Sequence, residues 1–331
     1  MMPVGKTRYS IVRVLLLWGC VVTCATSDGI AQTVSFEPIG RIPGPIDLIR
    51  VQETRAFVSA GKTLTVFDVS TPTSPTRLGA YSFPDRILGF RPSGSLVYVA
   101  ADLYGLGILE VSQDGTPKLR GSLKTPGSAK NVAVSGRTAL VADQVAGVDR
   151  IDVSDPAKPV LTGSIYLDGF ASDIVTAASL AFAVDRPTGF YVVDLSMPGS
   201  EEPLSTLQSS TAINGSSQVE VVLGSDGRPV VAVRALGAML LFDITNPAKP
   251  VELPPFRTPG RPQRVSIRGS MVYVADGPGG LQVVDVSQPS TPRIAGAYKT
   301  QQPAGDIAVA DSLVFVVERG GDVVILRQTG N

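Results

Sequence analysis

Short, nearly continuous apolar segments dominate the chain from residue 34 onwards. They are rich in Val, Ile, Leu and Tyr, and Gly, Pro, Asp and Ser separate them, as around Met271–Ala275 and Leu281–Val286. Runs of this kind are typical of β-strands and are too short and too often interrupted for amphipathic helices. A strand buried on one face would alternate apolar and polar residues, so the continuous runs indicate sheets that are covered on both faces.

One of these segments recurs at a fixed spacing. Each copy is an apolar strand that ends on an acid, followed by Ser or Thr and then Pro, as in LQVVDVSQPSTP from Leu281 to Pro292. The repeated acids are separated by 42, 42, 42, 49 and 42 residues, and they are Asp68, Glu110, Asp152, Asp194, Asp243 and Asp285. A further step of 42 residues reaches Arg327, within a similar strand segment. Seven units with four strand segments each predict an all-β fold, a seven-bladed β-propeller of four-stranded antiparallel blades.

The two ends of the repeat region complement each other. After Arg327 only four residues remain, which are too few for a fourth strand. Residues 34–42 resemble the fourth-strand segments around Gly79, Gly121 and Gly296. We therefore predict that residues 34–42 complete the last blade and close the ring, which removes an exposed sheet edge.

The first 31 residues differ from the repeats. Lys6, Arg8 and Arg13 precede an apolar run, Val14–Val22, and a polar stretch follows that ends at Ala31. The apolar run is about half the roughly 20 residues that a membrane-spanning helix needs. This pattern predicts a signal peptide over residues 1–31 and a propeller over residues 32–331. Two alternatives are a lipid anchor at Cys20, because LWGC loosely resembles a lipobox, and a buried N-terminal helix.

The repeated segment resembles a known family. LQVVDVSQPSTP and its copies are similar to the LVIVD repeat of exported bacterial and archaeal proteins, and the VYVAD segments also resemble YVTN-type propellers. The resemblance covers nearly the whole chain after residue 31. It implies a propeller at the cell surface or in the cell envelope, without a particular activity.

Missing residue types exclude several kinds of chemistry. The chain has no His, and its two Cys, at positions 20 and 24, lie in the predicted signal peptide. Catalysis by Ser-His-Asp or Cys-His groups and zinc sites built on His or Cys are therefore excluded from the mature chain. The formal net charge of zero predicts no general attraction to nucleic acid. We expect no cofactor, with a carboxylate-bound divalent cation such as calcium as the alternative.

Two positions in each unit are candidates for binding. Both lie on the face that carries the connections from strand four to the next strand one and from strand two to strand three, which we call the top. The residue 21 positions before each repeated acid, or before Arg327 in the last unit, opens the innermost strand. This selects Asp47, Asn131, Asp173, Arg264 and Asp306, with Gln218 added by alignment across an insertion. The residue nine positions before each acid, or before Arg327, ends the second strand, which selects Asp143, Asp185, Arg234, Asp276 and Glu318.

The many acids in these two sets have two interpretations. The functional one is a carboxylate-lined channel mouth that binds a cation, an amine or a basic peptide segment. The other is local, because Asp ends a strand well by accepting backbone N–H bonds. We favour the local interpretation for the second-strand set, and both stay open for the inner set. If the inner set binds, Asp173, Asp306 and Arg264 are the leading contacts, and we expect their replacement to leave the fold intact.

The function that fits best is an exported, non-catalytic binding or scaffold module in the cell envelope, with a protein or an envelope polymer as partner. One alternative is a carboxylate- or cation-dependent enzyme, such as a hydrolase, lyase or lactonase, with its site at the top mouth of the channel. Another is a platform subunit of an envelope complex. The fourth and fifth repeated acids are seven residues further apart than the others, and this insertion, with residues 209–217, is a candidate recognition loop.

Export predicts a defined N-terminus. Protein purified from the native envelope or medium should begin near Gln32, or at a lipidated Cys20, when its N-terminal peptide is identified by mass spectrometry. Recovery of the full-length chain from the cytoplasm, with Met1 retained, would contradict this prediction.

Overall fold

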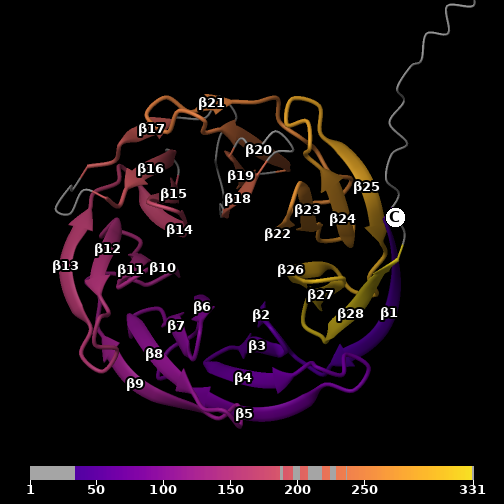
Figure 1. Cartoon of the computed structure of the whole chain (residues 1–331), viewed down its shortest axis with the longest axis horizontal. Coiled ribbons are helices and arrows are strands. Elements are labelled where there is room, and N and C mark those ends of the chain that lie inside the picture. The colour runs from indigo at the N-terminus through magenta and orange to yellow at the C-terminus, as the bar shows by residue number, and fades with distance from the viewer. Residues whose placement is uncertain are drawn as a thin grey trace, which may run out of the picture. The chain divides into compact units, whose positions relative to one another are not determined.

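The fold is a closed ring of β-sheets (Figure 1). The computed structural model describes residues 34–329, apart from residues 187–188, 197–201, 208–217, 224–228 and 236. The described residues form 28 strands in seven four-stranded antiparallel sheets, and they include no helix. The predicted seven-bladed β-propeller is therefore confirmed. The predicted signal peptide, Cys20 and the candidate loop 209–217 lie outside the described residues.

The blades follow the chain, and each runs from an innermost to an outermost strand. Blade 1 is β2 (Leu48–Gln52), β3 (Arg55–Ala60), β4 (Thr63–Asp68) and β5 (Thr76–Ser82); blade 2 is β6 (Gly89–Ser93), β7 (Leu96–Ala100), β8 (Leu106–Val111) and β9 (Pro117–Leu123). Blade 3 is β10 (Asn131–Ser135), β11 (Thr138–Ala142), β12 (Val148–Asp152) and β13 (Val160–Ile165); blade 4 is β14 (Phe170–Ala177), β15 (Leu180–Arg186), β16 (Phe190–Asp194) and β17 (Ser205–Leu207). Blade 5 is β18 (Val219–Leu223), β19 (Pro229–Ala235), β20 (Ala238–Asp243) and β21 (Val251–Glu252); blade 6 is β22 (Arg264–Arg268), β23 (Met271–Ala275), β24 (Leu281–Asp285) and β25 (Arg293–Tyr298). Blade 7 is β26 (Ala304–Ala310), β27 (Leu313–Glu318), β28 (Val323–Thr329) and β1 (Ser35–Ile42).

Blade 7 joins the two ends of the propeller. Strand β1 pairs antiparallel with β28, from Ser35 opposite Thr329 to Ile42 opposite Val323. The innermost strands contact one another around the full circle, including β26 with β2. The predicted closure by residues 34–42 is confirmed. The ring depends on this pairing, because without it β28 would present an open edge and a half-covered sheet.

The hydrophobic core is divided among the interfaces between blades. The described residues form seven buried clusters, one at each interface around the ring. Between blades 4 and 5, for example, the rings of Phe190 and Phe242 stack with their centroids 4.8 Å apart. Ile42, Ile49 and Phe315, which are all fully buried, join blades 7 and 1. Each sheet thus buries both faces, as the continuous apolar runs predict.

The repeated acids shape the turns on the bottom face, opposite the top. The backbone N–H of Ser70 donates to Asp68 Oδ1 at 2.8 Å, and Ser154 and Ser196 make the same contact with Asp152 and Asp194. The turns of blades 1, 2 and 3 pack against the preceding blade, where Gly40, Gly79 and Gly121 leave room for them. A Cβ placed on Gly40 would lie 2.0 Å from the carbonyl oxygen of Pro72. The motif is therefore required for the turns and for packing between blades.

Candidate functional site

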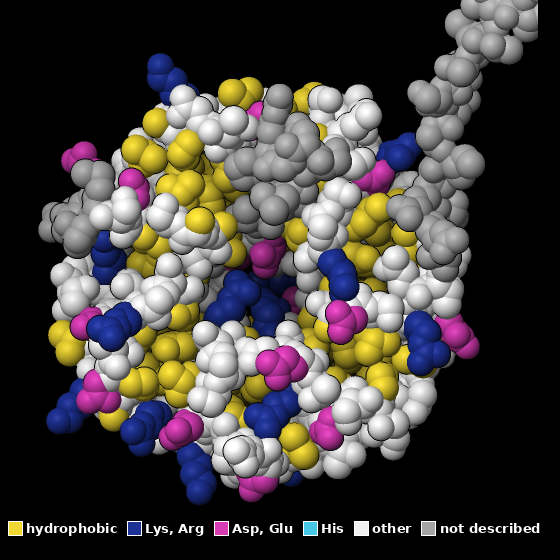
Figure 2. Space-filling view, in the orientation of Figure 1, with side chains coloured by type: hydrophobic (Ala, Val, Ile, Leu, Met, Phe, Trp, Pro, Cys, Tyr) yellow, Lys and Arg dark blue, Asp and Glu magenta, His cyan; other side chains and the backbone are white. Residues whose placement is uncertain are grey.

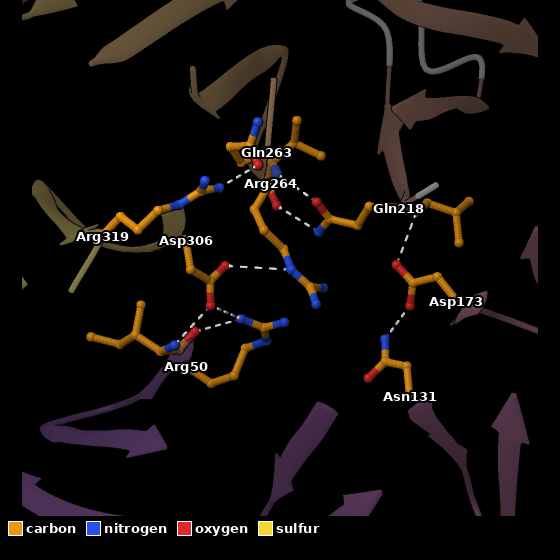
Figure 3. A network of polar contacts seen from close by, with 11 residues as sticks. Arg50, Asn131, Asp173, Gln218, Gln263, Arg264, Asp306 and Arg319 are labelled. Carbon is orange, nitrogen blue, oxygen red and sulfur yellow. Dashed lines mark hydrogen bonds and ion pairs between the residues drawn. The ribbon is translucent and has the colours of Figure 1, made fainter. Parts of the chain in front are cut away.

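Five of the six inner candidates form a belt around the top of the channel (Figure 3). The inner belt consists of Asn131, Asp173, Gln218, Arg264 and Asp306, each near the start of an innermost strand in blades 3 to 7. Their side chains reach from one blade to the next rather than into open solvent. The structure thus brings together residues that are up to 175 positions apart in the sequence.

The belt residues bind the backbone of the following blade. Asp173 Oδ2 accepts the N–H of Val219 at 3.1 Å, and the Asn131 side-chain amide donates to Asp173 Oδ1. The Gln218 side chain pairs with both the N–H and the carbonyl oxygen of Val265, at 2.8 and 3.2 Å.

Asp306 closes the belt between blades 7 and 1. Its Oδ2 accepts the N–H of Ile49 at 2.8 Å and Nη1 of Arg50 at 3.0 Å. The Nε of Arg264 lies 3.9 Å from Asp306 Oδ1, which adds a charge contact from blade 6. Each of these contacts crosses an interface between blades.

The burial of the belt corrects one expectation from the sequence. Asp173 is 3% and Asp306 is 0% exposed, so neither is an exposed contact that can be removed without loss of fold. Asn131 and Gln218 are buried as well, whereas the Arg264 side chain stays 20% exposed. Of the three leading contacts, Arg264 is the one with access to a ligand in the channel mouth.

Asp47 does not belong to the belt. Asp68 pairs with a residue 13 positions earlier, whereas Glu110 pairs with one 14 positions earlier, so the second hairpin of blade 1 is one residue shorter. Counting 21 residues back from Asp68 therefore selects Asp47, one residue before the first position of the innermost strand. Leu48 occupies that first position. Asp47 instead accepts the N–H of Gly61 at 2.9 Å and lies 3.4 Å from Arg86.

The outer candidates Asp143, Asp185, Asp276 and Glu318 are buried and bind the loop that enters their own blade. Asp143 accepts the hydroxyl of Thr125 at 2.8 Å and the N–H of Gly127 at 2.5 Å. Thr258 and Gly260 make the same two contacts with Asp276, and Glu318 accepts the N–H of Gln301 at 2.6 Å. These hydrogen bonds to nearby loop residues are the ones that the local interpretation predicts. The sequence signal for them is a Thr-Pro-Gly segment that begins 18 residues before Asp143 and 18 residues before Asp276.

Blade 3 holds a second buried carboxyl beside Asp143. Burial, and then the charge of Asp143, raises the pKa of Asp149 to about 6, and burial raises the pKa of Asp143 as well. In blade 4 the corresponding position is Tyr191, whose hydroxyl donates to Asp185 at 2.7 Å. Asp149 thus occupies a position at which blade 4 has a hydrogen-bond donor. The contact between Asp143 and Asp149 is therefore more favourable when one of the two carboxyl groups is protonated.

A cavity of about 410 Å³ opens at the top mouth of the channel. The space-filling view looks at the opposite, bottom face, and it too shows a hollow at the centre of the ring with basic side chains on its wall (Figure 2). The lining of the cavity includes four cationic residues, Lys130, Arg186, Arg234 and Arg264. Asp173 is the acid among the described lining residues, and the contacts of both its oxygens are already made.

The cations of this cavity lie close enough to repel one another. Burial, together with the charges of Arg264 and Arg186, lowers the pKa of Arg234 to about 10. Below them in the channel, burial raises the pKa of Glu220, and the neighbouring Arg91 and Arg50 oppose this shift. Among the described lining residues of the cavity, cations outnumber acids by four to one.

Counting from the repeated acids missed two of these cations. Lys130 precedes Asn131 and Arg186 follows Asp185, so each is the immediate neighbour of a selected residue. Because successive side chains of a strand point in opposite directions, the neighbours face the cavity while the selected residues face the protein. Alternation along the strand is the signal that could have found them.

Two further expectations concern metals and membranes. In the part of the chain that the structure describes, no three Asp, Glu, His or Cys side chains gather in a way that could hold a metal ion. The same residues include no helix long and apolar enough to span a membrane.

This architecture defines the protein as a seven-bladed β-propeller with a basic cavity at the mouth of its channel. Within that class, the family model of the LVIVD repeat matches residues 44–82, 126–166 and 259–300. The chain thus contains LVIVD repeats at these three positions, and its propeller fold is consistent with that family, as the sequence resemblance implied. No curated protein matches the chain.

Solved structures share the fold at low sequence identity. The β-propeller domain of Cps50 (Swd1) from Myceliophteria thermophila has a TM-score of 0.70 at 13% identity, over 89% of this chain and 100% of that one. The computationally designed protein Ika8 has a TM-score of 0.62 at 10% identity, over 88% and 98% of the two chains. BamB from Moraxella catarrhalis has a TM-score of 0.59 at 12% identity, over 88% and 98%. These similarities concern the fold alone.

The inner belt predicts a large loss of stability for Asp306→Ala. The substitution leaves the N–H of Ile49 and the guanidinium of Arg50 without their buried acceptor, which typically costs about 3–5 kcal/mol of unfolding free energy. Asp306→Asn retains one acceptor oxygen and should lose less. Urea unfolding measures both, with Asp85→Ala in the loop before β6 as a control that should change stability by about 0.5 kcal/mol or less. Equal stability of Asp306→Ala and the wild type would contradict the role of the belt.

The buried acid pair predicts a pH-dependent effect of Asp149→Asn. The pKa of Asp149 is about 6 in the folded protein against an ordinary value of 3.8, so the wild type loses stability as pH rises through this range. The amide stays neutral and can donate to Asp143. Above pH 6 the variant should therefore be more stable by roughly 1–3 kcal/mol, and near pH 4 the gain should disappear.

Urea unfolding at pH 4 and pH 7.5 tests this prediction. Glu37→Gln, at an exposed position of β1, is the control and should not alter the pH dependence. An identical pH dependence in the wild type and in Asp149→Asn would show that this carboxyl titrates normally.

Proposed function

We propose that this protein is an exported, non-catalytic binding module of the cell envelope, which binds an anionic group of a protein or an envelope polymer at the top mouth of its channel. The observation that carries the proposal is the cavity lined by Lys130, Arg186, Arg234 and Arg264, in which the acid Asp173 is already bonded to the protein. Export is supported by the pattern of residues 1–31.

The chemistry of the mouth favours binding over catalysis. The mature chain contains neither His nor Cys, so an enzyme here would depend on carboxylates. The carboxylates of the inner belt are buried and occupied by backbone N–H groups, and Asp143 and Asp149 are both 0% exposed. A substrate therefore has no access to the acid pair whose pKa values are raised.

The dimensions of the cavity limit what enters it. A volume of about 410 Å³ lies within the range of small-ligand pockets, which is roughly 300–1,000 Å³. It can take one acidic group with its neighbouring atoms, but not a folded domain. A macromolecular partner would thus insert a side chain, a chain end or a single charged unit.

Charge reversal tests the proposal. Two anionic probes carry a fluorescent label: a six-residue peptide that alternates Glu and Ser, and a six-unit oligomer of galacturonic acid. At low salt we expect at least one of them to bind, as measured by fluorescence anisotropy, and Lys130→Glu combined with Arg186→Glu should weaken that binding about tenfold or more.

The matched control reverses two charges on the opposite face. Lys158 and Lys249 are exposed at corresponding positions in the bottom turns of blades 3 and 5, and Lys158→Glu with Lys249→Glu should leave binding unchanged. If neither probe binds the wild type, or if both double variants lose affinity equally, the top mouth is not an anion site.

A further inference from the structure

Three large apolar side chains are exposed at the top of blades 3 and 4. Val145 is 66%, Tyr166 is 71% and Phe170 is 51% exposed, and we call these three residues the apolar rim. Phe170 itself lines the cavity, together with Gln144. Phe170 therefore belongs both to the apolar rim and to the lining of the basic cavity.

The contact between blades 3 and 4 places two rim residues side by side. Gln144 in the turn of blade 3 forms an antiparallel bridge with Ala171 at the start of blade 4, and the N–H of Ala171 donates to the carbonyl oxygen of Gln144 at 3.0 Å. Val145 follows Gln144 and Phe170 precedes Ala171. Because the two segments are antiparallel, Val145 and Phe170 lie opposite each other. Their backbone is held in place by the fold.

The fold does not require apolar residues at these positions. The bridge is repeated between Gly277 and Ala304, where Pro278 takes the place of Val145 and Pro303 that of Phe170. It is also repeated between Asp102 and Ala129, where the exposed Leu103 takes the place of Val145 and Ser128 that of Phe170. The exposed Leu119, Leu161 and Ile294, in contrast, recur on the outer strands of blades 2, 3 and 6 and belong to the repeat. Phe170 has no apolar counterpart where blades 2 and 3 meet, so the pair of apolar side chains occurs beside the charged cavity, and exposed apolar groups that gather in this way are typical of a contact surface.

We propose that the partner is an acidic, extended protein segment, which places a carboxylate between Lys130, Arg186 and Arg264 and a neighbouring apolar side chain on Val145 and Phe170. This inference rests on the proposed function and specifies its ligand. Successive side chains of an extended segment point to opposite sides, so residues two positions apart can reach the cavity and the rim. The Gln144 side chain, on the cavity wall between the two, offers both a donor and an acceptor for a peptide group.

A pair of peptides with equal charge separates the two contributions. One alternates Glu and Ser over six residues, and the other alternates Glu and Leu. We expect the Glu-Leu peptide to bind the wild type about tenfold more tightly, because it covers part of the exposed area of Val145 and Phe170. In the double variant Val145→Ser with Phe170→Ser, its affinity should fall to that of the Glu-Ser peptide, whose own affinity should change less than twofold.

The control removes two exposed apolar side chains elsewhere in blade 3. Val160 and Leu161, in β13, are 55% and 39% exposed, and Val160→Ser with Leu161→Ser should leave both affinities unchanged. A circular dichroism spectrum of each variant verifies the fold.

The outcomes distinguish the inference from the proposed function. If both peptides bind the wild type equally, the apolar rim is not used and the inference is overturned, while the anion site stands. If the galacturonic acid oligomer binds and neither peptide does, the partner is an acidic polymer and the inference is again overturned. If none of the three probes binds, both proposals fail.

Discussion

The structure depends on one constraint: each four-stranded sheet is apolar on both faces, so each needs a neighbour on both sides. A single sheet cannot meet this requirement, and a linear stack leaves two sheets half covered, whereas a ring covers all of them. Seven buried clusters at seven interfaces show how it is met here. The pairing of β1 with β28 is essential for the same reason, since it completes the blade that joins the two ends of the propeller.

Ring closure also determines what the polar residues at the channel mouth do. The innermost strands converge there, so the backbone N–H groups of one blade face the side chains of the next. Asp173 and Asp306 accept these N–H groups and are buried in doing so. Burial of an acid in this way is stable only because hydrogen bonds replace its hydration. The acids thus hold the ring together, and the cations beside them determine the charge of the cavity.

Departures from the repeat are where specific binding can arise. The bottom turns use the same acid and hydroxyl contacts in several blades, so they offer a partner similar surfaces. At the top, Val145 and Phe170 are exposed where blades 3 and 4 meet, and blades 4 and 5 contribute Arg186 and Arg234 to the cavity. An asymmetric surface on a symmetric ring orients a ligand, whereas seven equivalent sites could not.

The sequence by itself determined the blade count, the four-stranded units, the closure by residues 34–42 and the turn role of the repeated acids. These follow from spacing and alternation, which are local properties of a repeat. Only the tertiary structure decided which side chains reach the ligand. Because one hairpin of blade 1 is shorter by one residue, Asp47 lies outside the inner belt. Asp173 and Asp306 are buried, and they bind the backbone of the next blade. The sign of the charge in the cavity was decided there too, because its described lining brings together four cations and one acid. That balance arises among residues from four blades, and no pattern within one repeat contains it.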